Sequence, residues 1–409
     1  MASPNSDHII IEPTGETLLI LDTPGAKFAV WTAFEDVGDG SHDTNAEDID
    51  DEFFHQDGLE EEITPNWTKW EEHDKSEEEE NIRRRADSPL PSVSMIWEEH
   101  STHSTAYDSV KLVAPPALVY QISSTHLITA SPRFKEELAS QNEGCKDENG
   151  LFHLKASRWD PDAFTILLNV LHTRYRRVPK ELSLEMVAKI AVMIDYYRCG
   201  EAFELISEIW IRHLRAHHSI PKTYNRDLML WVLVSWVFKL PKEFSRCTAR
   251  ALRQCTQPSI QYLELGIPPV ILQAIQTRRS SAIAQVLETC NYWIDEFSDT
   301  YTCKVGEHMS FECSSMLLGA LMKQMKGLGF LSPRAIAPFD GFSLESMAEG
   351  VKGMRSPVWE TYNEVNELYP ISHSCSLETT VVRDLGSVVA RVKGLVLGDF
   401  LDEGEGLED

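Results

Sequence analysis

The chain has 409 residues, a length that allows two or three domains of average size. Apolar residues make up 42% and charged residues 25%, so most of the chain can bury a core. The formal net charge is −26, from 38 Lys and Arg against 64 Asp and Glu. Because binding to nucleic acid or to anionic lipid requires local positive charge, this balance argues against both kinds of partner.

The N-terminal residues and the cysteines bear on the compartment. Met1 to Asp7 contain no basic segment followed by an apolar one, so we expect no secretory signal. The longest apolar run, Leu228 to Phe238, is too short to cross a bilayer and predicts a buried helix instead. Eight cysteines without a secretion signal indicate reduced thiols. We therefore expect an intracellular protein, in the cytoplasm, the nucleus or both, with no membrane association.

Most of the negative charge lies in one segment. Residues 35–107 hold 23 acidic and five basic residues, a net −18, whereas the other 336 residues carry −8. Acidic runs such as Glu77 to Glu80, with few aliphatic residues between them, cannot bury enough apolar surface to offset chain entropy. We predict a disordered acidic insertion. A solvated surface loop is the favoured interpretation; a docking segment for a basic partner, or a phosphorylated loop at Ser88, are alternatives.

Short β-prone runs flank this insertion. Glu16 to Asp22 and Lys27 to Trp31 are separated by a Thr-Pro-Gly turn and predict a hairpin. Beyond the insertion, Ser109 to Val113 and Leu118 to Ile122 are again strand-like, and Phe152 to Leu154 is a further short strand. We expect residues 16–22 to lie beside residues 118–122 in one sheet. The intervening loop is tolerable, because loop-closure entropy grows only logarithmically with length.

Helix signals follow in order. Ser131-Pro132 and Asp160-Pro161 each place a capping side chain before a proline at the first helical position. Apolar residues at helical spacing then predict two further helices, with Leu184 to Ile194 as the stripe of one and Phe203 to Leu214 as the stripe of the next. Residues 220–291 are expected to be all helical, with breaks at prolines. The predicted fold class is α+β: a small sheet covered by helices, followed by a mostly α-helical C-terminal region.

Several of these segments together resemble a known family. Gly15 to Leu19, Val119 to Phe134, Trp159 to His172 and Ala191 to Cys199 are similar, in this order, to the strand and helix motifs of BTB/POZ domains, specifically those of fungal proteins with a helical C-terminal extension. Segments near the end of the chain, such as Phe339 to Ser343, look like the tail of the same group. The resemblance implies a BTB/POZ-like domain at 9–218 that the acidic segment interrupts, a helical extension at 219–300, a C-terminal helical region at 301–400 and an acidic tail at 401–409.

The resemblance also implies a function. BTB/POZ domains commonly dimerise, and some bridge substrates to cullin-type ubiquitin ligases. We therefore expect a non-enzymatic adaptor or scaffold that binds proteins and self-associates. An adaptor that recruits substrates to a cullin scaffold is the alternative, although no recognisable substrate-binding module follows the domain.

Catalytic motifs are missing from the sequence. It contains no Gly-rich phosphate loop, no G-x-S-x-G turn and no H-E-x-x-H pair. His126 is close in sequence to Ser123, Ser124 and Ser131, but no partnering carboxylate is visible, so we interpret these residues as structural. His172 and Cys199 are expected to be packed helix residues. We predict no catalytic residue, no cofactor and no small-molecule substrate, with an enzyme assembled from scattered residues as an alternative.

Two basic clusters are interpreted as solvated surfaces. One lies between Arg212 and His218 at a predicted helix end, where the helix dipole favours positive charge. The other comprises Arg174, Arg176, Arg177 and Lys180, and it is opposite in charge to the acidic insertion. An intramolecular contact between this second cluster and the insertion is a hypothesis that salt would test.

One set of residues suggests a metal. Cys303, His308, Cys313, His373 and Cys375 are residue types that bind zinc. However, Cys303 and Cys313 are further apart in sequence than the usual pair of ligands, and His373 and Cys375 are closer together. We favour buried cysteines that act as small apolar residues and assign no metal site. A zinc-stabilised regulatory protein with Cys303, Cys313, His373 and Cys375 as ligands remains an alternative.

Overall fold

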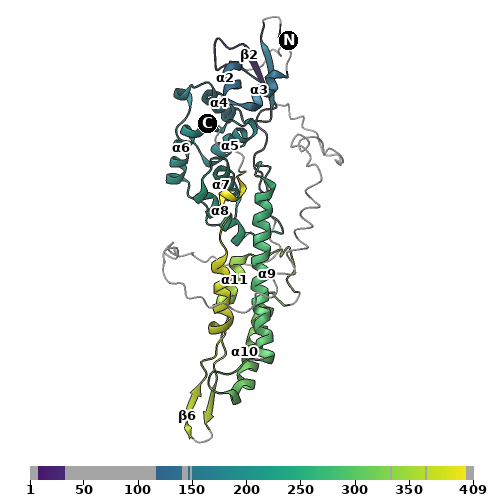
Figure 1. The fold of residues 1–409 in the computed structure, drawn as a ribbon, viewed down its shortest axis with the longest axis vertical. Helices are drawn as coiled ribbons and strands as arrows, with labels where there is room; N and C mark the ends of the chain where they lie inside the picture. Colours follow the sequence, from purple (N-terminus) through teal and green to yellow (C-terminus); the bar gives the residue numbers. More distant parts are fainter. Residues whose placement is uncertain are drawn as a thin grey trace, which may run out of the picture. The chain divides into compact units, whose positions relative to one another are not determined.

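The computed structural model describes residues 8–32, 117–140, 146–147, 150–331, 334–363 and 366–401 (Figure 1). The acidic insertion predicted at 35–107, the strand predicted at Ser109 to Val113 and the tail after Leu401 lie outside these residues. The described residues form an α+β fold with one small mixed sheet and eleven α-helices, which confirms the predicted fold class at this level. None of the described helices combines the length and hydropathy needed to span a bilayer.

The sheet has four strands in the order β1-β3-β2-β4. β2 runs antiparallel to β3 and parallel to β4, whereas β1 pairs with β3 in parallel. Leu18 pairs with Gln121 and Leu19 with Tyr120, so the expected pairing of residues 16–22 with 118–122 is confirmed. The strands are β1 (His8–Ile10), β2 (Thr17–Asp22), β3 (Leu118–Ile122) and β4 (Phe152–Ser157).

Alternation along β2 places one face of the sheet on the core. Thr17, Leu19 and Leu21 are fully buried, and the residues between them are half-buried. This period of two is typical of a strand with one face covered. The turn before β2 needs Gly15, because a Cβ at this position would overlap the backbone carbonyl of Ile122.

The predicted hairpin of residues 16–22 with residues 27–31 is wrong. Both edges of β2 are occupied by β3 and β4, so no edge remains for a third strand. The carbonyl groups of Phe28 and Ala29 instead accept hydrogen bonds from the Arg226 side chain, at 3.2 and 2.8 Å. Trp31 packs edge-on against Tyr224. The segment after β2 is therefore held by Tyr224 and by Arg226, the first residue of α7 (Arg226–Val237), and not by the sheet.

Five helices follow or flank the strands of the sheet. Ser131 caps α3, since its hydroxyl accepts from Phe134 N–H at 3.1 Å, and Asp160 caps α4 by accepting from Ala163 N–H at 3.0 Å. Both predicted caps are confirmed. The predicted apolar stripes are buried faces of α5 and α6. The helices are α2 (Ser124–Ala130), α3 (Pro132–Ala139), α4 (Pro161–Leu171), α5 (Leu184–Tyr197) and α6 (Gly200–His217).

Three helices form the extension that was expected after residue 219. α7 (Arg226–Val237) packs between α5 and α8 (Pro241–Gln254), and its residues from Leu228 to Val234 are at most 1% exposed. The longest apolar run is thus a buried helix, as predicted. α9 (Pro269–Asp299) is the long helix drawn in green in Figure 1. Pro241 and Pro269 occupy the first positions of α8 and α9, where a missing backbone N–H costs nothing.

The C-terminal part combines helices with a hairpin that the sequence analysis did not predict. α10 (Ser310–Gly327), α11 (Leu344–Lys352) and α12 (Arg383–Arg391) each pack against α9. Between α11 and α12, β5 (Glu360–Asn363) and β6 (Asn366–Ser372) form a two-stranded antiparallel hairpin, drawn in yellow-green in Figure 1. His373, one of the cysteine and histidine residues considered as metal ligands, directly follows β6.

Candidate functional site

A carboxylate lies at the junction of β3 and α2, where the sequence did not indicate a partner for the serine and histidine residues. Glu16 Oε1 accepts a hydrogen bond from Ser124 N–H at 2.9 Å and another from the Ser124 hydroxyl. These bonds hold the pKa of Glu16 below its usual value, against an opposing effect of burial, which is the largest single cause. The residues are 108 positions apart in the chain. Glu16 ties the start of β2 to the first turn of α2, so the serine hydroxyl serves to hold this junction together.

The two histidines of this junction differ in their bonding. His172 Nδ1–H donates to Leu168 O at 2.8 Å, and His172 Nε2 accepts from Ser123 N–H at 3.0 Å. This pattern fixes the neutral imidazole, and burial, the main cause, lowers the pKa of His172. The His126 ring stacks on the His172 ring with centroids 5.1 Å apart. The predicted packed role of His172 is confirmed, as is that of Cys199, which is 1% exposed.

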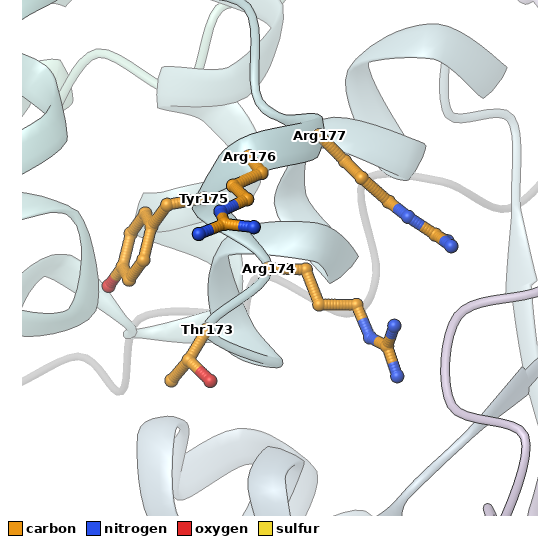
Figure 2. A pocket seen from close by; sticks show the side chains of 5 residues that line it. All are labelled: Thr173, Arg174, Tyr175, Arg176 and Arg177. Carbon is orange, nitrogen blue, oxygen red and sulfur yellow. The ribbon is translucent and has the colours of Figure 1, made fainter.

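The basic segment after α4 forms a shallow surface pocket (Figure 2). Arg174 forms an ion pair with Glu12, whose carboxylate lies 2.6 Å from the guanidinium. Arg177 donates a hydrogen bond to Ile10 O at 3.4 Å. Figure 2 shows both side chains extending to one side while Tyr175 points to the other. Arg176 and Lys180 are exposed and form no ion pair with any described residue. The proposed contact of this segment with the acidic insertion stays a prediction, because the insertion lies outside the described residues.

The second basic cluster occupies the last turns of α6. Arg215 pairs with Glu243 at 2.7 Å. His213 and His217 stack with ring centroids 4.4 Å apart, and His217 Nδ1 lies 3.1 Å from His213 O. Arg212 and His218 are exposed. These contacts are those of a solvated helix end, as interpreted from the sequence.

Three of the five predicted metal-ligand candidates come together, and a fourth is beside them. The ligand atoms of Cys303, Cys313 and His373 all lie within 4.8 Å of one another. Cys375 Sγ is 3.9 Å from Cys303 Sγ, and His373 Nδ1 is 3.3 Å from the same sulfur. His308, the fifth candidate, is exposed and does not belong to the group.

Elements distant in the sequence position this cluster. Cys303 follows the C-terminal end of α9, and Cys313 lies in the first turn of α10. His373 and Cys375 come directly after β6. The three cysteines are at most 4% exposed, and the His373 ring stacks on Trp359 with centroids 3.6 Å apart. The β5–β6 hairpin, which was not predicted from the sequence, brings His373 and Cys375 close to Cys303 and Cys313.

Backbone and side-chain groups surround the sulfurs. Val305 N–H donates to Cys303 Sγ and Lys304 N–H to Cys375 Sγ, both at 3.4 Å. Although burial opposes it, the hydrogen bond from Lys304 N–H and the nearby Tyr301 hydroxyl and cysteine thiols lower the pKa of Cys375. Burial raises the pKa of Cys313, and the adjacent sulfurs add to this effect.

No family model, no curated protein and no solved structure matches the chain.

Proposed function

We propose that the chain is a non-enzymatic interaction protein whose residues 9–218 form a BTB/POZ-like domain that self-associates. The segments that carry the sequence resemblance occupy β2, the β3–α2–α3 unit, α4 and α5. The pairing of β2 with β3 supports the proposal, because these two strands of one sheet come from opposite sides of residues 23–117 in the sequence. The C-terminal helices then extend the domain.

One surface carries the proposal. Leu205 is 80% exposed and Ile209 is 38% exposed on the outward face of α6. The same helix buries Phe203, Ile206 and Trp210 on its other face. Two large aliphatic side chains, one helical turn apart, thus form an apolar ridge on a helix whose core face is already complete. A partner that covers this ridge would remove apolar surface from water.

The charges along α6 favour a second copy as that partner. Glu201 lies one turn before Leu205, and Arg212 lies one turn after Ile209, so all four side chains share one helix face. In an antiparallel pair of α6 helices, a two-fold axis places Leu205 opposite Ile209 of the second copy. The same axis brings Glu201 to the level of Arg212 of the second copy. The two-fold arrangement therefore places apolar side chains opposite each other and brings one pair of opposite charges to the same level.

A contact of this kind is small. A stable interface buries about 1,600 Å² in total, whereas one helix pair supplies only part of this area. We therefore expect a weak and reversible dimer, whose population rises with protein concentration. Glu201 and Arg212 would stay partly exposed to solvent at this interface, so added salt should weaken the attraction between them.

Sedimentation equilibrium of the full chain tests the proposal. The wild type should show a concentration-dependent monomer–dimer equilibrium, and Leu205→Glu should shift it to monomer. Ile128→Glu is the matched control, because Ile128 is 37% exposed on α2 and lies away from the ridge. Glu201→Arg should weaken the dimer, and the double variant Glu201→Arg with Arg212→Glu should restore it. A wild type that stays monomeric at all concentrations, or a dimer that Leu205→Glu leaves intact, would contradict the proposal.

Binding to a cullin-type ligase scaffold stays a prediction that follows from the resemblance alone. Mixing the purified chain with a cullin scaffold and measuring co-elution would test it. The self-association experiment is independent of its outcome.

A further inference from the structure

We propose that Cys303, Cys313, His373 and Cys375 bind one Zn²⁺ ion in a closed structural site. Three thiolate sulfurs and one imidazole nitrogen are the donor set that zinc takes in such sites. The inference concerns the C-terminal part of the chain and does not depend on the proposed self-association through α6.

The distances from Cys303 Sγ to two other donor atoms match the edges of a tetrahedral zinc site. Zinc–sulfur bonds of about 2.3 Å and zinc–nitrogen bonds of about 2.0 Å require edges of about 3.8 Å between sulfurs and about 3.5 Å between sulfur and nitrogen. The Cys303 and Cys375 sulfurs are 3.9 Å apart, and Cys303 Sγ is 3.3 Å from His373 Nδ1. Cys313 Sγ lies within 4.8 Å of both the Cys303 and the His373 ligand atoms. Cys375 is outside this close group of three, so binding of the ion would draw its sulfur closer to the other donors.

The surroundings favour charged sulfur over neutral thiol. The N–H groups of Val305 and Lys304 point at the sulfurs of Cys303 and Cys375, each at 3.4 Å. Such bonds stabilise thiolates, and they are the outer contacts that orient metal ligands. Three cysteines that acted only as apolar packing would require neither these donors nor an imidazole nitrogen turned toward them. A single disulfide between two of the cysteines would leave the third sulfur and the imidazole without a role.

The donor set also selects the metal and its role. Sulfur and imidazole donors disfavour Mg²⁺ and Ca²⁺, which take oxygen ligands. Four protein donors leave no position for water or substrate, so the ion would be structural and not catalytic. It would link the end of α9 and the start of α10 to the segment after β6. Cys303 and Cys375, which it joins, are 72 residues apart in the chain.

Metal analysis of the purified full-length chain tests the site. Protein prepared under reducing conditions without chelator should contain one zinc per chain by elemental analysis. Replacement by Co²⁺ should give the intense visible absorption of tetrahedral cobalt bound to thiolates. Cys313→Ser and His373→Ala should each lose the zinc or bind it many-fold more weakly, and a chelator should lower the Tm of the wild type.

Matched variants separate metal binding from folding. His308→Ala removes a histidine near the site in sequence but outside the cluster, and Cys290→Ala removes a fully buried thiol of α9. Both should keep one zinc per chain, as should Leu205→Glu. If the ligand variants do not fold, the wild-type protein still tests the site. It should release one zinc per chain as a mercurial reagent titrates its thiols. A folded, reduced wild type that holds no zinc, shows no cobalt–thiolate spectrum, or holds iron instead would overturn the proposal.

Discussion

Replacing Arg279 with methionine should destabilise the chain strongly. Arg279 lies in α9, is 0% exposed and forms no salt bridge with a carboxylate of the described residues. Its guanidinium donates to four backbone carbonyls: Cys255 O at 2.8 Å, Pro338 O at 2.9 Å, Phe339 O at 3.0 Å and Phe342 O at 2.8 Å. Burial lowers the pKa of Arg279, and the negative charge of Asp340 partly opposes this effect.

The expected loss follows from two opposing effects. Hydrogen bonds from a charged group contribute about 1.5–3 kcal/mol each, and removing one partner leaves buried carbonyls unsatisfied. The burial of the guanidinium costs several kcal/mol, which the variant no longer bears. We therefore expect Arg279→Met to lower the free energy of unfolding by about 3–5 kcal/mol. Arg279→Lys should recover little of this loss, because one ammonium cannot reach all four carbonyls.

Urea unfolding of the full chain, followed by tryptophan fluorescence, measures this change. Arg278→Met is the control: Arg278 is the exposed neighbour with a single long hydrogen bond, to Gly394 O at 3.4 Å, and its loss should cost less than about 0.5 kcal/mol. A loss below about 1 kcal/mol for Arg279→Met would refute the reasoning, because it would mean that the four carbonyls find other partners.

Two further predictions concern a histidine and a glycine. The pKa of His172 is lowered from 6.5, so its contribution to stability is complete above this value and is lost as the pH falls through the lowered pKa. Between about pH 8 and about pH 5, the free energy of unfolding of His172→Gln should therefore fall less steeply than that of the wild type, and equal slopes would contradict this. Gly394→Ala should cost about 1–3 kcal/mol in urea unfolding, because the new Cβ would overlap the Ser245 carbonyl. Gly398→Ala, where a Cβ meets nothing within 4 Å, is its control, and equal losses in the two variants would exclude the overlap as the cause.

The parts of the fold that depend on nearby residues could be predicted from the sequence. The caps at Ser131 and Asp160 use a side chain and an N–H three residues away, so a short motif contains the whole interaction. The burial of α7 follows from its apolar residues on every side. The pairing of β2 with β3 could also be predicted, because each strand shows its own pattern and the loop between them costs little.

The failures arose where a distant residue decides the structure. The turn after Asp22 is a reasonable hairpin signal, yet Arg226, about two hundred positions later, takes the carbonyls of residues 28 and 29. Glu16 was not seen as the partner of Ser124 because 108 residues separate them and neither belongs to a motif with the other. In both cases the local sequence was compatible with a structure that the protein does not adopt, and only a contact with a distant residue excluded that structure.

The cysteine-histidine cluster shows why sequence spacing alone did not predict which of these residues come together. Spacing rules for zinc assume that each pair of ligands lies on one tight turn, where two to four residues bring two sulfurs to the same ion. Here the first pair spans the turn between α9 and α10, so helix geometry and not sequence proximity brings Cys303 and Cys313 together. The second pair straddles Ser374, and the hairpin before it returns the chain to α9. A search for cysteines and histidines on elements that pack together, such as α9 with α10, would therefore detect clusters of this kind that motif spacing does not indicate.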